Sequence, residues 1–392
     1  MSRDGNALFS VAFRPFFLMG SCWIALALAV WIISFVGGRP LNTALPAVSW
    51  HIHAMLFGFV LAAIAGFILT AVASWTGRPP INGSLLALLA LLWALGRVLN
   101  LFSALAPFWI VAATDVAFPL ALALLVAREI VAARSRRNFM MPIPIALLAV
   151  ADALMYLEAA GVGIPTGLGW RLALAAVITL ISVVGARIVP TLTRNWLARR
   201  GAAALPRSHR WLDGVGSATL HTGLLAWALF PAALPAGLLL LLGAALTFAR
   251  FLGWKGWTTL DEPLLWILHA GYLWMIVGAA LLGLAVIAPV IPESAAVHAL
   301  TAGAIGTMVL AVMTRVCRGH TGRPLAADRL AVVIYLSVNA AGVVRVAAEL
   351  LPDAYQSLLE VAAILWIGAF LLFALWSAPV VWRPRTDRQP AS

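Results

Sequence analysis

The chain has 392 residues, of which 63% are hydrophobic and only 10% are charged, and its mean hydropathy is +1.01. A soluble domain carries about 25% charged residues, so this composition excludes a soluble protein. The net charge of +12 invites a nucleic-acid-binding interpretation, but the basic residues sit in short connections between apolar runs and form no single stripe. The composition therefore predicts an integral membrane protein that lies in a lipid bilayer and binds no nucleic acid.

Apolar runs of about 20 residues follow one another along the chain, and each is long enough to cross a hydrocarbon core as an α-helix. The first run is longer than a signal-peptide core and is followed at once by others, so we expect it to be retained. We predict an all-α polytopic transmembrane helical bundle, with a single membrane domain over 1–392 and a polar tail at 380–392. The twelve predicted spans are 14–36, 51–74, 84–103, 107–127, 141–160, 169–189, 212–231, 235–253, 263–288, 294–314, 326–350 and 355–379.

The basic residues also predict the orientation of the spans. If the N-terminus is cytoplasmic, 22 of the 26 basic residues fall on the inner side. Cytoplasmic loops are rich in Lys and Arg, and one missed helix would exchange the sides of every later loop. We therefore expect both termini in the cytoplasm. Spans of this length are unlike the short strands of β-barrels and favour an inner-membrane bilayer.

Part of the sequence repeats at a distance of 245 residues without a gap. A weaker echo, from Thr191 to Asn195, closes the sixth span, which suggests three four-helix repeats. Such an arrangement resembles the haem–copper oxidase architecture, an analogy at the level of fold alone. The pairs that match are His53-Ala54 with His298-Ala299, Gly58 with Gly303, and Thr76-Gly77-Arg78-Pro79 with Thr321-Gly322-Arg323-Pro324.

Five of the seven histidines lie in or at the ends of predicted spans. A polar ring inside a bilayer is costly without a partner, so each is a candidate functional residue. The alternative is a histidine hydrogen-bonded to a neighbouring helix. Neutral imidazole binds iron, copper and zinc, and two of these histidines are related by the repeat, so we favour metal or haem ligation. The predicted metal ligands are His51, His53, His221, His269 and His298.

Three of these histidines, His51, His53 and His298, are also the predicted cofactor-binding residues. His51 and His53 are two residues apart, so on a helix they point about 200° from each other and cannot bind one metal together. One could face a haem paired with His298, while the other faces a second centre. Outside the spans, we expect His209 to be solvated and His320, in a turn with glycine and proline, to be structural or to contact an anion.

Buried acids form a second set of candidates. Asp115 in span four and Asp152 and Glu158 in span five are the predicted catalytic residues, because chains of such groups can relay protons within a membrane. The alternative is that each pairs with a buried arginine or with neighbouring backbone. The sequence contains no nucleotide-binding motif and no C-x-x-C-H haem attachment site.

Five distinctive strings of residues lie at 13–17, 50–55, 76–79, 269–272 and 313–324. Together they resemble the NnrS family over nearly the whole chain. The resemblance implies a bacterial inner-membrane protein that contains haem b and copper and takes part in denitrification and in tolerance of nitric oxide. The family often has a glutamate after the second histidine of its opening motif, where this chain has Ala54, so an acid at that place is not essential here.

Two functions are consistent with these expectations. One is a metalloenzyme that binds nitric oxide and reduces or consumes it, with electrons from an unknown donor; joining two molecules into nitrous oxide takes two electrons and two protons. The other is a non-enzymatic nitric oxide sensor or a transporter of metal or nitrosyl-iron species, since an internal repeat is also common in secondary transporters. The clustered histidines favour metal over an organic solute. We expect a haem- and copper-binding protein of the nitric oxide response.

Overall fold

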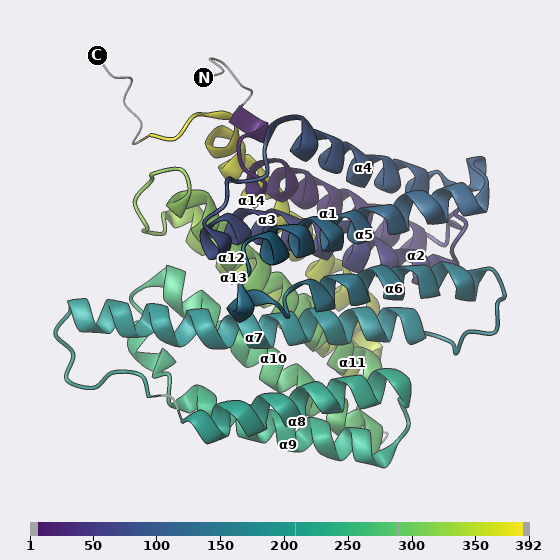
Figure 1. The fold of residues 1–392 in the computed structure, drawn as a ribbon. Coiled ribbons are helices and arrows are strands. Elements are labelled where there is room, and N and C mark those ends of the chain that lie inside the picture. Colours follow the sequence, from purple (N-terminus) through teal and green to yellow (C-terminus); the bar gives the residue numbers. More distant parts are fainter. Residues whose placement is uncertain (1–6, 208, 289, 387–392) are drawn as a thin grey trace. The chain divides into compact units, whose positions relative to one another are not determined.

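The computed structural model describes residues 7–207, 209–288 and 290–386, and long α-helices dominate this part of the chain (Figure 1). No strand occurs within these ranges, and the predicted all-α class is confirmed. The α-helices are α1 (Phe13–Val36), α2 (Ala47–His53), α3 (Leu61–Thr76), α4 (Gly83–Leu101), α5 (Phe108–Ala132), α6 (Pro142–Ala159), α7 (Leu168–Arg199), α8 (Arg210–Leu229), α9 (Leu234–Leu252), α10 (Pro263–Ile287), α11 (Glu293–His298), α12 (Gly306–Gly319), α13 (Arg329–Leu350) and α14 (Tyr355–Trp382).

Eleven helical stretches among the described residues are long and apolar enough to cross a membrane, and they coincide with eleven of the predicted spans. The remaining prediction, 212–231, corresponds to α8, which is long enough at 20 residues but carries Arg210, Asp213 and His221. The helices α7 and α12 extend beyond the ends of the predicted spans, because the chain stays helical after the apolar run has ended. The chain is therefore a multi-pass membrane protein. Of the predicted tail, 387–392 lies outside the described residues.

The described chain divides into two compact units. Unit 1 comprises Met1–Ala176, Met313–Pro324 and Phe370–Ser392, and unit 2 comprises Val177–Val312 and Leu325–Ala369. Within unit 1, α1 packs against α3, and α5 packs against both α4 and α6. Within unit 2, α9 packs against α8 and α10, and α10 also packs against the start of the tenth span. Each unit thus has its own interior of packed helices.

Two of the spans contain a π-helical segment, in which the helix is wider than an α-helix. The segment η2 covers Ala54–Val60 and the segment η6 covers Ala299–Ile305. Both are seven residues long, and the same 245-residue shift that aligns the sequences superimposes their bounds. His53 directly precedes η2 and His298 directly precedes η6. The repeat is thus a property of the backbone as well as of the sequence.

The packing of the two π segments is also related. A Cβ atom on Gly58 would lie 2.1 Å from the indole Nε1 of Trp23, and one on Gly303 would lie 2.5 Å from the indole Cδ2 of Trp274. In each case the glycine allows an indole from a preceding helix, α1 or α10, to lie directly against the widened turn. We call α1 to α5 the N-terminal copy and α10 to α14 the C-terminal copy.

The weaker sequence echo behaves differently. It lies in α7, which runs as one α-helix of 32 residues with Pro190 inside it. Within α7 there is no π segment. The third four-helix repeat therefore stays a prediction.

Candidate metal centre

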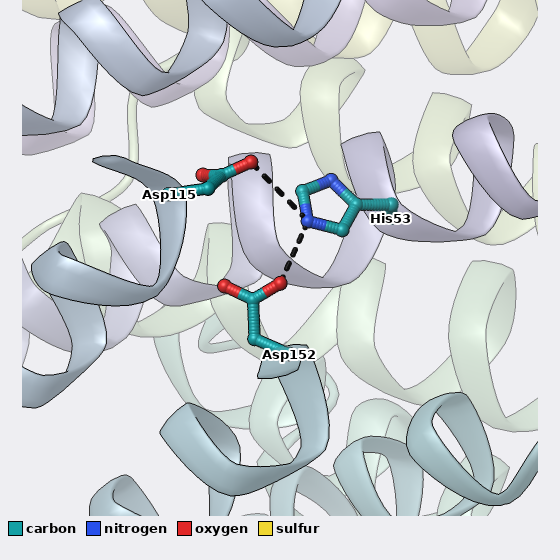
Figure 2. Close-up of side chains that lie close together, drawn as sticks. All are labelled: His53, Asp115 and Asp152. Atoms are coloured by element: carbon teal, nitrogen blue, oxygen red, sulfur yellow. Dashed lines mark hydrogen bonds and ion pairs between the residues drawn. The ribbon is translucent and has the colours of Figure 1, made fainter. Parts of the chain in front are cut away.

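A buried histidine in unit 1 lies between two buried carboxylates. His53 is the last residue of α2, and its Nε2 lies 2.8 Å from Oδ1 of Asp152 and 3.3 Å from Oδ2 of Asp115 (Figure 2). Asp115 comes from α5 and Asp152 from α6, and none of the three side chains is more than 1% exposed. Their donor atoms lie within 4.8 Å of one another, the one such group of three or more His, Cys, Asp or Glu among the described residues. We call these three residues the metal triad.

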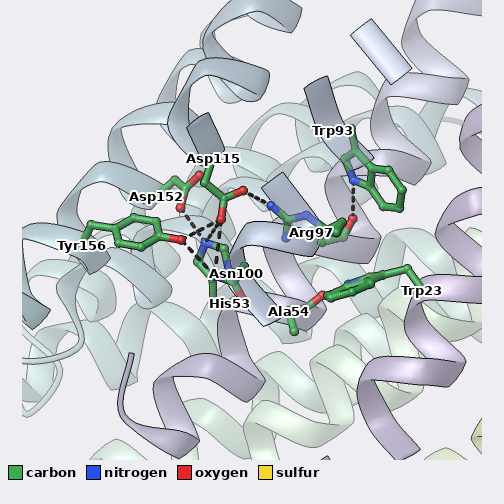
Figure 3. A network of polar contacts seen from close by, with 10 residues as sticks. Trp23, His53, Ala54, Trp93, Arg97, Asn100, Asp115, Asp152 and Tyr156 are labelled. Atoms are coloured by element: carbon green, nitrogen blue, oxygen red, sulfur yellow. Dashed lines mark hydrogen bonds and ion pairs between the residues drawn. The ribbon is translucent and has the colours of Figure 1, made fainter. Parts of the chain in front are cut away.

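Three polar side chains surround the metal triad (Figure 3). Tyr156 Oη donates a hydrogen bond to Asp115 Oδ2 at 2.7 Å, and Asn100 Nδ2 donates to Tyr156 Oη at 2.9 Å. The same Asn100 nitrogen lies 3.4 Å from Nδ1 of His53. Arg97 Nη2 donates to Asp115 Oδ1, which forms a buried ion pair. These side chains thus orient Asp115 and His53, whereas Asp152 is bonded to His53 itself.

All these side chains lie near one end of unit 1. Asn100 is the next-to-last residue of α4, Asp115 lies seven residues after the start of α5, and Asp152 lies seven residues before the end of α6. Seven helical residues span about 10 Å, so the site is buried but close to this end of the helices. This is the end predicted to face the outer side of the membrane.

Indole groups stabilise the widened backbone beside the triad. Trp23 Nε1 donates to the carbonyl oxygen of Ala54 at 3.0 Å, and Trp93 Nε1 donates to that of Gly58 at 2.9 Å. A backbone carbonyl in a bilayer must be satisfied inside the protein. The indoles from α1 and α4 therefore hold η2 in place, and π segments frequently occur at functional sites.

The donor set of the metal triad fits a divalent cation. One imidazole nitrogen and two carboxylate oxygens suit iron, manganese, zinc or Cu(II), whereas Cu(I) prefers the thiolate and thioether sulfur that the triad lacks. Two further buried acceptors, Asp152 Oδ2 and Asn100 Oδ1, have no hydrogen-bond partner among the described residues. Buried acceptors are normally satisfied, and a bound cation is one way to satisfy them.

A haem fits His53 poorly and His298 better. Both ring nitrogens of His53 already face side-chain partners. His298 Nδ1 donates to the carbonyl oxygen of Ser294 at 2.7 Å, which leaves Nε2 unprotonated, the arrangement typical of metal-bound histidine. Its side chain is 23% exposed, and a carboxylate oxygen of Glu349 lies 3.8 Å from Nδ1. Arg345 forms an ion pair with Glu349 at 2.6 Å.

The other predicted metal ligands have different surroundings. The ring of His51 stacks on Trp31, with the ring centroids 4.7 Å apart. His269 Nε2 lies 2.9 Å from Oγ1 of Thr193, and His221 Nε2 is buried without a hydrogen-bond partner among the described residues. Within the described residues none of these three histidines belongs to a group of three donors. Their roles as ligands stay predictions.

Glu158, the third predicted catalytic acid, lies apart from the metal triad. Its two carboxylate oxygens each accept a hydrogen bond at 3.0 Å from the backbone N–H of Gly167, in the turn after α6. Of the two histidines outside the predicted spans, His320 contacts the ring of Phe13 with the centroids 6.0 Å apart. Partial burial and the charge of Arg385 lower the pKa of His320 below its ordinary value.

Sequence reasoning missed two residues of the site. Arg97 and Asn100 both fall in the predicted third span, and Arg97 is one of the four basic residues that the predicted topology leaves on the outer side. An arginine that lies within an apolar span, here six residues before its predicted end, is a functional candidate by the same reasoning as an intramembrane histidine. That signal, applied to Arg97, would have pointed to a buried acidic partner.

Fold and site together define a polytopic α-helical membrane protein with a buried group of one histidine and two aspartates, which is a candidate metal site. The family model described as NnrS protein matches residues 7–385, so the chain belongs to the NnrS family. No curated protein matches the chain significantly. Family membership supports a membrane protein of the nitric oxide response that binds metal.

Proposed function

We propose that this chain is a metalloprotein of the bacterial inner membrane that binds nitric oxide at a divalent metal ion held by His53, Asp115 and Asp152. The observation that supports this proposal most directly is the metal triad itself. Three donor atoms of suitable chemistry converge within 4.8 Å, in side chains that are at most 1% exposed. Unpaired charges are costly in such surroundings, and a cation compensates two adjacent carboxylates.

Haem b and copper are the cofactors that the family implies, and the proposal places them on different residues. Copper as Cu(II) fits the metal triad, and His298 offers an imidazole nitrogen for haem iron. When bound, these metals would supply open coordination positions for nitric oxide and electrons received from a donor protein that we do not identify. Arg345, beside His298, is suited to pair with an anionic group of a cofactor.

The residues around the triad would hold and move protons. Tyr156 donates to Asp115 at 2.7 Å and accepts from Asn100 at 2.9 Å, so its phenol proton is directed at a carboxylate that would bind the metal. The site lies about 10 Å from the ends of α5 and α6, a short distance for protons and for a small uncharged molecule such as nitric oxide. Consumption of nitric oxide, which needs protons, is therefore the reaction that we propose.

The test uses the full-length purified protein and measures bound metal, optical spectra and nitric oxide consumption. His53→Ala, Asp115→Asn and Asp152→Asn should each lower bound divalent metal by about 10-fold or more, because each removes a ligand. Asp353→Asn is the control, since this exposed residue lies far along the chain in the turn before α14. His298→Ala should remove haem absorbance.

Two results would contradict the proposal. If the three triad variants kept the metal content of the parent protein, the triad would be an ion-pair network and not a ligand set. If the metal-loaded, reduced protein consumed no nitric oxide above the background of the triad variants, the site would bind metal for another purpose.

A further inference from the structure

Arg97 has more hydrogen-bond donors than the structure uses. Its side chain is 4% exposed, and Nη2 donates to Asp115. The other two nitrogens, Nε and Nη1, are buried without a hydrogen-bond partner among the described residues. The indole of Trp23 covers one face of the guanidinium, with Cζ of Arg97 5.8 Å from the centroid of the indole ring. Leaving buried donors of a charged group unsatisfied costs stability, so an acceptor at this position would be strongly favoured.

The charges of the site also call for one more anion once a metal is bound. Asp115 and Asp152 carry two negative charges and Arg97 carries one positive charge, while a metal-bound His53 is neutral. A divalent ion would leave a net charge of +1 in a low-dielectric interior, where an uncompensated charge is costly.

Two other charged groups of unit 1, on α6 and α7, do not alter this balance. Glu158 and Arg171 both lie against Gly167: Glu158 accepts from its N–H, and a Cβ there would lie 2.8 Å from Arg171 Nη1. One is negative and the other positive, so they offset each other. The surplus charge therefore belongs to the metal triad and Arg97.

The guanidinium of Arg97 lies beside the triad through its bond to Asp115, and its unused Nη1 lies against the backbone of η2. A Cβ atom on Gly58 would lie 3.1 Å from Arg97 Nη1, so the guanidinium rests on the side-chain-free part of η2. Residue His53 directly precedes the same segment, and Asp115 connects the two through its two oxygens, one near His53 and one bonded to Arg97. Figure 3 shows the guanidinium and the triad as one continuous network.

We propose that a small monovalent anion binds to the metal of the triad and accepts hydrogen bonds from the unused nitrogens of Arg97. This inference rests on the proposed metal site. Azide, nitrite and the one-electron-reduced form of nitric oxide share the required size and charge. Arg97 is thus a specificity residue that favours a ligand carrying negative charge over an uncharged one.

The test follows azide binding to the full-length protein loaded with Co(II), whose visible absorption reports the metal ligands. At constant ionic strength, sodium azide should change the spectrum of the parent protein in a saturable manner. Arg97→Gln should bind Co(II) but weaken azide binding about 10-fold or more, the equivalent of one lost hydrogen bond to a charged group. Arg39→Gln, an exposed arginine in the loop after α1, should bind azide as the parent does.

Since Arg97→Gln leaves Asp115 without its partner and can impair folding, Arg97→Lys is the second variant. Lysine keeps the charge but offers one point of donation, so azide should bind several-fold more weakly than to the parent. Equal azide affinity in the parent and in either folded variant would overturn the inference, as would a Co(II) spectrum insensitive to azide. If Asp152→Asn bound Co(II) as tightly as the parent, the proposed metal site would fail and the inference with it.

Discussion

The two copies share a backbone arrangement but differ in chemistry. In each copy a histidine directly precedes a seven-residue π segment, and a glycine in that segment lies against an indole. In the N-terminal copy the ring of His53 is fully buried between Asp115 of α5 and Asp152 of α6, the helix that follows this copy. In the C-terminal copy His298 is held by a carbonyl of its own helix and has one carboxylate nearby. The comparison indicates that the repeat positions the histidine, while the partner helices decide what it can bind.

The largest difference between the copies should appear when each buried arginine is neutralised. In metal-free protein, Arg97→Gln should lower the free energy of unfolding by about 3–5 kcal/mol, because it leaves Asp115 buried without its partner. Arg345→Gln should cost less, since Arg345 and Glu349 are each more than 10% exposed and Glu349 also accepts from Ser294. Reversible unfolding in mixed micelles measures both. Equal losses of unfolding free energy in the two variants would contradict this prediction and would show that the two sites are equally closed to solvent.

Adding a methyl group to the π segments should affect both copies alike in stability but only one in metal binding. Gly58→Ala and Gly303→Ala should each cost about 1–3 kcal/mol, because the added Cβ collides with an indole that must move. Only Gly58→Ala should also lower metal binding at the triad. Analysis of the divalent, non-haem metal beside the unfolding measurement decides this, and loss of that metal in Gly303→Ala would contradict the assignment of the triad site to the N-terminal copy.

Removing an indole N–H should produce a smaller difference in stability and metal binding between the copies. Trp93→Phe removes the donor to the Gly58 carbonyl of η2, whereas Trp274→Phe removes a donor to Oδ1 of Asn339 on α13. Each should cost about 1 kcal/mol. We expect weaker metal binding only in Trp93→Phe, because only there does the lost bond belong to the backbone that carries His53. An unchanged metal affinity would mean that η2 does not depend on this indole.

The smallest effect concerns the ends of the repeat, where His320 stands at the position of Trp75. The pKa of His320 is lowered in the folded protein, so the unfolded chain binds protons more readily. Its contribution to stability is therefore complete above about pH 6.5 and is lost as the pH falls from there toward the folded pKa. His320→Gln should make unfolding less dependent on pH between 5 and 7. A parent protein without any such dependence would contradict the prediction.

The positions of the helices were largely predictable from the sequence, because apolar length in a bilayer leaves few alternatives. The helix α8 also lies close to the predicted range 212–231, although it is not among the eleven stretches apolar enough to cross a membrane. His53, Asp115 and Asp152 were each recognised as costly residues in apolar spans. Their convergence was not predictable, because it depends on how α2, α5 and α6 pack and not on any spacing along the chain.

Other parts of the site were harder to predict from the sequence. The π segments could not be predicted, since hydropathy does not distinguish a wide helix from a regular one. The repeat that relates Gly58 to Gly303 was a sign of a special backbone at these positions. The predicted topology leaves Arg97 on the outer side, and the pairing of Asp115 with a buried arginine was an open alternative in which no arginine was named. One charged residue in a span can set the topology and also take part in a site, so both roles need to be considered.

The π segment gives the site an unusual vulnerability to changes in chain length. A π turn holds one residue more than the α-helical register requires, so it acts as a phase shift between the residues before it and those after it. Deleting any single residue from 54–60 would let the span close into a regular α-helix, with its apolar surface against α1 preserved. The residues on either side would keep about their present angular relation, because the π turn only absorbs the extra residue, so the ring of His53 would still point toward its aspartates. The same span could therefore remain inserted in the membrane and keep its ligand, yet lose the widened turn against which Trp23 and Arg97 pack, by the loss of one codon.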